Sequence, residues 1–299
     1  MTPTEKRTLH LFLLTDQNAF QRAQASAAER AAQSRDLEIQ VYYAESHGVI
    51  QVEQLFASIF AKRGPKPDAI LVETMAADGM PRVARNAVQA GIGWGVINCA
   101  PEYTSQLRSS HPELPIFSVG VDNGRVGEIQ GAQLARLLTS KHAPSVLCVR
   151  GPAESPAARA RTKGLRAVLA SHDITLASVD TDWTSAGAKS VVTEWLRFHD
   201  KNIAAVVAQN DEIAEGALAA FPEASATDVR IPFIGCDGLP AGGQALVRSG
   251  VLAATVVTPL PSEAGVGAFA DFFSQGTMPE EQIVITPQSF PRVEEILIL

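Results

Sequence analysis

Residues 204–218 read AAVVAQNDEIAEGAL, and they contain the unit from which most of the chain is built. The apolar run at 204–208 is short and ends at polar residues, which is typical of a buried strand in a parallel sheet. An amphipathic helix pattern follows at once, and either Asn210 or Asp211 can cap its free backbone N–H groups. The stretch therefore predicts a strand, a polar turn and a helix.

Asn210 lies in that turn, at the expected carboxyl end of the strand. Open α/β sheets place their ligands at this end of the strands. An amide can donate and accept hydrogen bonds at once, which suits a polyhydroxylated ligand. The alternative is that Asn210 and Asp211 form only a cap and a turn, as such pairs often do, and this stretch by itself favours capping.

The same strand-then-helix alternation extends from residues 9–14 to residues 283–285. Repeated units of this kind form parallel sheets with helices on both faces. About ten strands exceed one comfortable sheet, so the sequence predicts an α/β fold of two doubly wound parallel-sheet lobes. Residues 100–115 interrupt the alternation with three prolines and are expected to form a loop, and the turn at 120–124 is a candidate crossing between the lobes.

Composition and charge exclude several classes of protein. The chain has 299 residues, of which 46% are apolar, and this is enough for a full core in two domains. Its 25 basic and 32 acidic residues give a net charge of −7, and no basic patch marks a nucleic-acid interface. No apolar run approaches the roughly 18 residues of a membrane span, so we expect no membrane insertion.

Motifs for metal binding and catalysis are missing from the sequence. The six histidines lack metal-ligand spacing, and the three cysteines, Cys99, Cys148 and Cys236, are expected to be packing residues without a disulfide framework. There is no GxSxG elbow or P-loop, and Cys236, which ends a strand, has no histidine near it in sequence. We therefore expect no metal, no cofactor and no enzymatic activity, although a doubly wound scaffold never excludes an enzyme by itself.

Four stretches carry a resemblance to a known family. They are VGVDN at 119–123 with the glycines that follow it, AARARTKGL at 157–165, AVVAQNDE at 205–212, and IGCDG at 234–238 followed by GVLAATV at 250–256. In this order and spacing they resemble the type I periplasmic sugar-binding proteins, the ribose-binding group. Those proteins share their fold with the effector domains of lactose-repressor-like regulators.

The resemblance implies two lobes joined by a three-segment hinge, with the ligand captured in the cleft between them as the hinge closes. Mapped onto this sequence, the N-terminal lobe is residues 1–121 plus 259–286, and the C-terminal lobe is residues 122–258 plus 287–299.

In the N-terminal lobe the resemblance places Asn18, Phe20 and Asn98 against the ligand. Phe20 would stack on the C–H face of a sugar ring, and the alternative is that it starts the helix core. Many relatives carry Asp followed by Arg where this chain has Asn98 and Cys99, so the charged bidentate group is gone. Asp16 and Glu73 also end strands, either as cleft acids or as helix caps.

In the C-terminal lobe the resemblance adds five ligand contacts. Arg161 matches the family's ligand arginine, whose planar fork can bridge two oxygens, and Trp183 matches an aromatic wall. Asp237 would complete a polar set with Asn210, and Thr258 stands where relatives often carry Gln. The plainer alternatives are a solvated arginine, a core tryptophan and a turn-forming aspartate.

These observations favour a solute-binding protein that captures a small carbohydrate-like ligand for an ABC-type transporter. The alternative is a stand-alone cytosolic sensor that resembles a repressor effector domain without a DNA-binding part. The expected partners are a sugar or polyol and a membrane permease or sensor, with no nucleic acid, and the protein is expected to be a monomer. The resemblance implies a periplasmic location, whereas a native start at Met1 would imply the cytoplasm.

Overall fold

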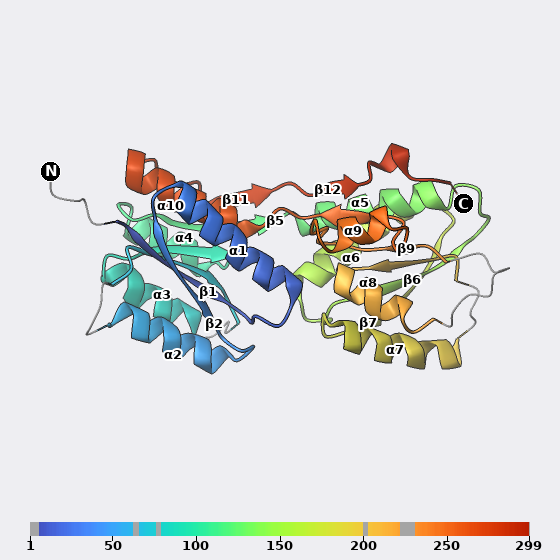
Figure 1. Ribbon diagram of the computed structural model, residues 1–299, viewed down its shortest axis with the longest axis horizontal. Helices are drawn as coiled ribbons and strands as arrows, with labels where there is room; N and C mark the ends of the chain where they lie inside the picture. Colours follow the sequence, from blue (N-terminus) through green and yellow to red (C-terminus); the bar gives the residue numbers. More distant parts are fainter. Residues whose placement is uncertain (1–5, 62–65, 76–78, 200–202, 222–230, 299) are drawn as a thin grey trace. The chain divides into compact units, whose positions relative to one another are not determined.

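The computed structural model describes residues 6–61, 66–75, 79–199, 203–221 and 231–298 (Figure 1). Contacts divide the chain into two compact units. The first unit is Met1–Val121 with Leu260–Ile285, and the second unit is Asp122–Pro259 with Thr286–Leu299. The chain therefore passes from one unit to the other three times, after Val121, Pro259 and Ile285.

The first unit contains a six-stranded sheet in the order β11-β5-β4-β3-β1-β2, and every neighbouring pair is parallel. Its strands are β1 (Thr8–Leu13), β2 (Glu38–Tyr43), β3 (Ala69–Glu73), β4 (Gly93–Ile97), β5 (Ile116–Val121) and β11 (Gln282–Ile285). β1 and β4 are buried along their whole length, as expected for central strands that are covered on both faces.

Helices cover both faces of this sheet because alternate residues of each strand point to opposite sides. Phe12 and Ile70 pack with one group of helices, and their neighbours Leu11 and Leu71 pack with the other. The first group is α2 (Gly48–Ile59), α3 (Met80–Gln89) and α4 (Tyr103–Ser110), and the second is α1 (Ala19–Ser34) and α10 (Pro261–Gln275). Figure 1 shows α2 and α3 on one side of the sheet and α1 and α10 on the other.

The second unit repeats this design with a four-stranded parallel sheet in the order β7-β6-β8-β9. The strands of this sheet are β6 (Ser145–Arg150), β7 (Thr175–Asp180), β8 (Ala205–Ala208) and β9 (Phe233–Ile234). The unit has two further strands, β10 (Thr255–Val257) and β12 (Gln288–Phe290). β10 and β12 form an antiparallel pair. Two single parallel bridges, Ile234 to Ala254 and Asp237 to Val257, join the β9 segment to the β10 segment.

Helices also cover both faces of the second sheet. Val146 and Val207 face α5 (Asn123–Leu137) and α6 (Pro156–Leu169). Leu147 and Val206 face α7 (Ser185–Phe198) and α8 (Asp211–Leu218). Short helices α9 (Gly243–Arg248) and η1 (Val293–Glu295) complete the described elements of this unit. The predicted α/β fold, with parallel sheets between layers of helices, is confirmed.

Polar residues cap five of the helices that follow a strand. Each accepts a hydrogen bond from a backbone N–H group in the first turn, which otherwise has no partner. These caps are Asn18, Asp122, Ser155, Thr184 and Asn210. The caps fix turns at the carboxyl ends of the strands, and these turns include the predicted ligand contacts Asn18, Trp183 and Asn210.

The expected loop at residues 100–115 is wrong, because it contains α4. Two of its prolines, Pro101 and Pro112, lie just outside the ends of the helix, where proline is tolerated. Leu107 is buried and Tyr103 packs against the same core cluster, so the helix has an apolar face of i, i+4 residues. The strand β12 is also missing from the predicted alternation.

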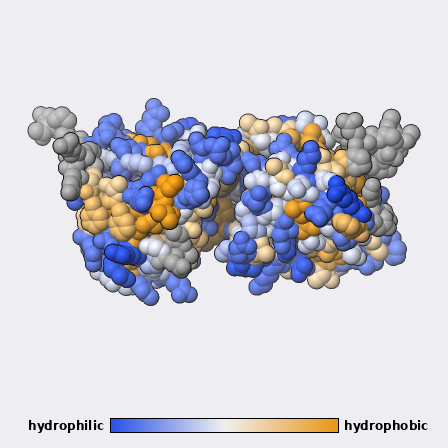
Figure 2. All heavy atoms as spheres, turned by 90° about the horizontal axis from the view of Figure 1, so that it is seen from below, coloured by the Kyte–Doolittle hydropathy of each residue, from blue (hydrophilic) through white to orange (hydrophobic). Residues whose placement is uncertain are grey.

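Figure 2 shows one face on which hydrophilic atoms (blue) are mixed with scattered apolar atoms (orange). Over the whole described chain, the large apolar side chains that remain exposed are Val49, Phe60, Met75, Phe198, Val284, Leu297 and Ile298. Isolated exposed apolar residues of this kind are common on folded proteins.

Candidate functional site

The order of strands in each unit fixes where a ligand can bind. In the first unit the order reverses between β3 and β1, and in the second it reverses between β6 and β8. In open α/β sheets the ligand crevice lies outside the carboxyl ends of the strands at such a switch point. Seven of the eight predicted ligand contacts follow β1, β4, β6, β7, β8 or β9, and the eighth, Thr258, follows β10.

Arg161 is held at the edge of the second unit by groups from three segments. Its Nε donates to Asn123 Oδ1 at 2.8 Å, and its Nη1 donates to the backbone oxygen of Gln209. The guanidinium carbon lies 5.8 Å from the centre of the Trp183 ring, within range of a cation–π contact. The structure therefore places Arg161 beside the end of β8 instead of leaving it solvated.

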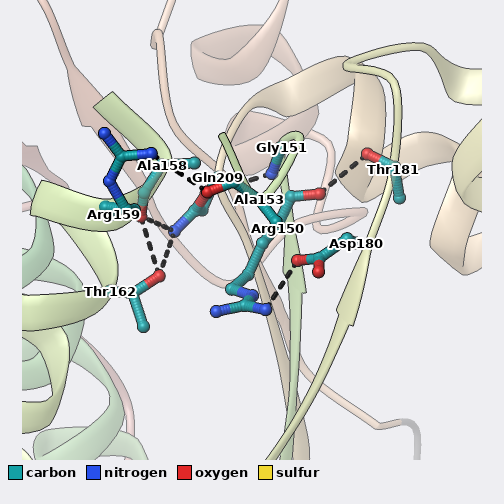
Figure 3. A network of polar contacts seen from close by, with 9 residues as sticks. All are labelled: Arg150, Gly151, Ala153, Ala158, Arg159, Thr162, Asp180, Thr181 and Gln209. Atoms are coloured by element: carbon teal, nitrogen blue, oxygen red, sulfur yellow. Dashed lines mark hydrogen bonds and ion pairs between the residues drawn. The ribbon is translucent and has the colours of Figure 1, made fainter. Parts of the chain in front are cut away.

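Gln209 fixes the loop and helix that carry Arg161 (Figure 3). Its buried side chain accepts from the Gly151 N–H at 3.0 Å, and donates to Ala158 O and Thr162 Oγ1, each at 3.0 Å. One amide thus links the end of β8 to the end of β6 and to the first turns of α6. Because these bonds are buried, leaving any of the partner groups unpaired would cost free energy.

Trp183 lies half-buried after β7, in a left-handed backbone conformation with φ of 71°. Part of its ring packs on the apolar core, and a Cβ on Gly151 would lie 2.2 Å from the indole. A glycine at 151 is therefore needed for the ring to lie where it does. The side chain therefore packs partly on the core and stays partly exposed, and its role as an aromatic wall stays a prediction.

Asn210 caps α8, which was the plainer alternative for this residue. Its Oδ1 accepts from the Ile213 N–H at 2.6 Å, and its Nδ2 donates to Trp183 O at 3.2 Å. An amide group has two N–H donors and two acceptor lone pairs, and the contacts of Asn210 with described residues use one of each. Capping and ligand contact are therefore compatible at this position.

Asp237 follows β9 with φ of 92°, and its backbone oxygen accepts from the Thr258 N–H at 3.1 Å. The side chain of Thr258 is buried and its hydroxyl reaches the same oxygen at 3.5 Å. Burial raises the pKa of Asp237 to about 8, with Arg161 opposing the shift and the neighbouring Asp211 adding to it. Thr258 thus holds the backbone that presents Asp237.

Asp211 is a buried carboxylate, for which the sequence predicts only a capping role. Its Oδ2 accepts from the Gly238 N–H at 2.8 Å and its Oδ1 accepts from Thr255 Oγ1 at 2.7 Å. A Cβ on Gly235 would lie 2.1 Å from the carboxylate. Burial raises the pKa of Asp211 to about 7. Asp211 therefore ties the start of α8 to β10 and to the segment that carries Asp237.

The first unit has its own polar cluster after β1, β3 and β4. Asn18 caps α1 by accepting from the Gln21 N–H at 2.8 Å. The side chain of Gln21 donates to Glu73 Oε2 at 2.8 Å, and Asn98 hydrogen-bonds to the same carboxylate. Burial raises the pKa of Glu73, and these two amides oppose the shift. Asn98 has φ of 65°, a left-handed conformation that asparagine tolerates.

The two remaining first-unit positions lie close in sequence to this cluster. Phe20 is half-buried in the first turn of α1. Cys99 is exposed as a residue and its thiol is free, with the sulfur 3.7 Å from Thr74 Oγ1. Local desolvation of the sulfur, to which the charge of Glu73 adds, raises the pKa of the thiol.

Cys148 and Cys236 are buried free thiols, as expected for packing residues. Burial raises the pKa of each to about 12, so both are thiols at neutral pH rather than thiolates. Among the described residues, no group of three or more His, Cys, Asp or Glu side chains could hold a metal ion. The described helices include none that is long and apolar enough to cross a membrane.

Three site-building residues lay outside the predicted set: Gln21, Gln209 and Asp211. All three directly adjoin or closely follow predicted contacts, and all three are buried. The sequence signal for such residues is a polar residue at a position that the helix or strand pattern predicts to be buried. A buried glutamine or aspartate needs several partners, so it marks a place where segments are joined.

The chain matches the family described as periplasmic binding protein domain over residues 11–269. The ribose import binding protein RbsB of Escherichia coli (strain K12) is 32% identical over 204 residues, which cover 68% of this chain and 63% of that protein. The xylitol-binding protein of Mycolicibacterium smegmatis is 30% identical over 212 residues, 70% of this chain and 57% of that protein. The chain thus spans about six-tenths of the length of these two relatives, which are named for binding and not for a reaction.

Solved structures are similar over almost the whole chain. A galactofuranose binding protein superposes with a TM-score of 0.80 at 21% identity, covering 97% of this chain and 98% of that one. A solute binding protein from Actinobacillus succinogenes 130z with bound D-allose gives 0.81 at 23% identity, covering 95% and 97%. At these identities the likeness establishes the fold, and the match over residues 11–269 establishes the family. This chain belongs to the family of periplasmic binding protein domains.

Proposed function

We propose that the chain binds a small polyhydroxylated, carbohydrate-like ligand, and that the second unit makes the main contacts. The observation that carries this proposal is the grouping of Arg161, Trp183, Asn210 and Asp237 at the carboxyl ends of the second sheet. These side chains come from four different βα units, so the order of the strands brings them together and no single helix or hairpin does so.

The chemistry of this group suits a sugar or a polyol. The Arg161 fork and the Asn210 amide can donate to hydroxyl oxygens, while the carboxyl of Asp237 can accept from hydroxyl hydrogens. The Trp183 ring offers a flat apolar face for the C–H groups of a ligand. Trp183, Asp237 and Asn98 all have positive φ. This backbone conformation costs free energy in residues other than glycine, and residues that adopt it are found often at ligand sites.

The relatives support the same class of ligand. Their names and titles refer to ribose, xylitol, galactofuranose and D-allose, all of which are small and rich in hydroxyl groups. We infer no single sugar for this chain, because Asn98, Cys99 and Thr258 depart from the family pattern at three positions.

The proposal extends to the whole molecule. We propose Asn18, Phe20 and Asn98 of the first unit as further ligand contacts, as the resemblance to the family implies. The ligand-loaded protein then delivers its cargo, as a periplasmic monomer, to a membrane permease. The word "import" in the name of the Escherichia coli relative supports this role.

A thermal-shift screen of sugars, polyols and nucleosides tests the ligand class. A ligand at 100 times its dissociation constant stabilises the folded state by roughly 2.7 kcal/mol, which gives a clear rise in melting temperature. We expect at least one sugar or polyol to produce this rise and leave its own chemical structure unchanged. Stabilisation by nucleosides alone, or release of a modified sugar, would contradict the proposal.

A further inference from the structure

The carboxylate of Glu73 is a built feature of the first unit that the contacts proposed above do not use. Gln51, which is fully buried on α2, donates to Glu73 O at 2.7 Å and accepts from the Met75 N–H at 2.9 Å. Gln21 from α1 donates to the carboxylate itself at 2.8 Å. Two helices therefore hold the backbone and the side chain of Glu73 at the carboxyl end of β3.

No cation accompanies this carboxylate in the part of the chain that the structure describes. The ion pairs found there join Lys6 to Asp36, Arg7 to Asp68, Arg125 to Glu128 and Arg150 to Asp180. The groups that act on Glu73 are the amides of Gln21 and Asn98, and the pKa of the carboxyl stays raised in spite of them. In the second unit, by contrast, the charge of Arg161 acts on Asp237.

Burial raises the free energy of a charged carboxylate. Neutral amide donors offset only part of this desolvation cost, so the half-buried carboxylate of Glu73 keeps the rest. A ligand hydroxyl would add one more neutral donor. A ligand ammonium would add a positive charge and up to three N–H donors. A charge-assisted hydrogen bond of that kind is about twice as strong as a neutral one.

We propose that Glu73 selects for an amino group on the ligand, so that the chain binds an amino sugar or an amino-substituted polyol more tightly than its neutral counterpart. This inference rests on the proposed function and narrows its ligand class. Glu73 contacts the ammonium group directly, Gln21 orients the carboxylate, and Asn98 offers its amide oxygen as a second acceptor beside it.

Calorimetric titration of the full chain with matched pairs tests the proposal: D-glucosamine with D-glucose, D-galactosamine with D-galactose, and an inosamine with myo-inositol. We expect at least one amine to bind about 10- to 150-fold more tightly than its neutral partner, the range given by one hydrogen bond to a charged group. Glu73→Gln keeps the shape and the bond from Gln21 but removes the charge. It should abolish the preference, so that the amine and its neutral partner bind with similar affinity.

Glu53→Gln is the matched control, because Glu53 is an exposed acid on α2 of the same unit. It should keep the preference for the amine. If the wild-type chain binds neutral sugars as well as or better than their amines, or if Glu73→Gln retains the preference, the role assigned to Glu73 is wrong while sugar binding stands. If no member of any pair binds while another sugar or polyol of the thermal-shift screen does, the amine preference is wrong and sugar binding stands.

Discussion

Asp211 is not a predicted ligand contact, but it joins the segments that carry predicted contacts. It accepts hydrogen bonds from Gly238 and Thr255 and fills space that the glycines at 235 and 243 leave open. Its carboxyl lies among neutral donors, so burial dominates and its pKa rises to about 7. The side chain therefore carries a titration that the stability of the second unit should report.

The sign of that effect follows from proton binding. The pKa of Asp211 is near 3.8 in the unfolded chain and about 7 in the folded chain, so the folded state binds more protons between these values. The contribution of Asp211 to the free energy of unfolding is therefore greatest below pH 3.8 and falls as the pH rises toward 7, by up to about 1.4 kcal/mol per pH unit.

Asp211→Asn should remove this contribution. The amide can accept from Gly238 and donate to the Thr255 hydroxyl, which can serve as an acceptor, so the variant should fold. Urea unfolding at pH 4 to 7.5 gives the measurement. The difference in free energy of unfolding between wild type and variant should shift steadily in favour of the variant as the pH rises. A difference that does not change with pH would show that Asp211 does not titrate in this range.

At the scale of elements, the close packing of α5 on α6 places Arg161. A Cβ on Gly127 would lie 1.9 Å from Arg161 O, and a Cβ on Gly164 would lie 2.0 Å from Gly124 O. The two helices therefore approach each other through glycines, backbone against backbone. This contact sets the position of α6, and Arg161 lies at the point where the helices meet.

Gly127→Ala should push α6 away and destabilise the chain by about 1–3 kcal/mol, the usual cost of overpacking. Because the clash is with the backbone of Arg161 itself, ligand affinity should fall as well. Gly267→Ala on α10 is the matched control, since its Cβ would meet only the Arg35 guanidinium at 3.4 Å. Thermal melting should show Gly267→Ala at or slightly above wild type. Equal melting temperatures for the two variants would rule out the proposed role of this contact.

The sequence could predict the elements in which apolar residues recur with a clear strand or helix spacing. Central strands such as β1 and β8 are short apolar runs, and the helices after them carry a polar cap. α4 was missed because prolines surround it, although they lie outside its ends. β12 has three residues and pairs antiparallel with β10, so neither its length nor the βα alternation could reveal it.

At the scale of the whole molecule, sequence could predict the fold class and the family, because both depend on the order of many βα units and motifs. The expected lobe boundaries at 258/259 and 286/287 each lie one residue from the divisions at 259/260 and 285/286. Sequence could not predict the partners of Glu73, Gln209 or Asp211. Those depend on which turns the sheet order brings together. The ligand roles of the eight predicted contacts stay predictions.

The central claim is that the second unit makes the main contacts to a carbohydrate-like ligand. Calorimetry of Arg161→Ala, with the sugar or polyol found by the screen, tests it most directly. Arg159→Ala is the control, because Arg159 lies exposed on the same helix and bonds only to the loop before it among its described contacts. Cys99→Ala in the first unit is a second control, because a thiol is a weak hydrogen-bond partner.

Arg161→Ala leaves ligand hydroxyls and the Gln209 oxygen without their donor, at roughly 1–3 kcal/mol, so affinity should fall about 5- to 150-fold. Both controls should bind within about threefold of wild type. Wild-type affinity in Arg161→Ala together with a large loss in Cys99→Ala would contradict the account, because the ligand would then depend on the first unit.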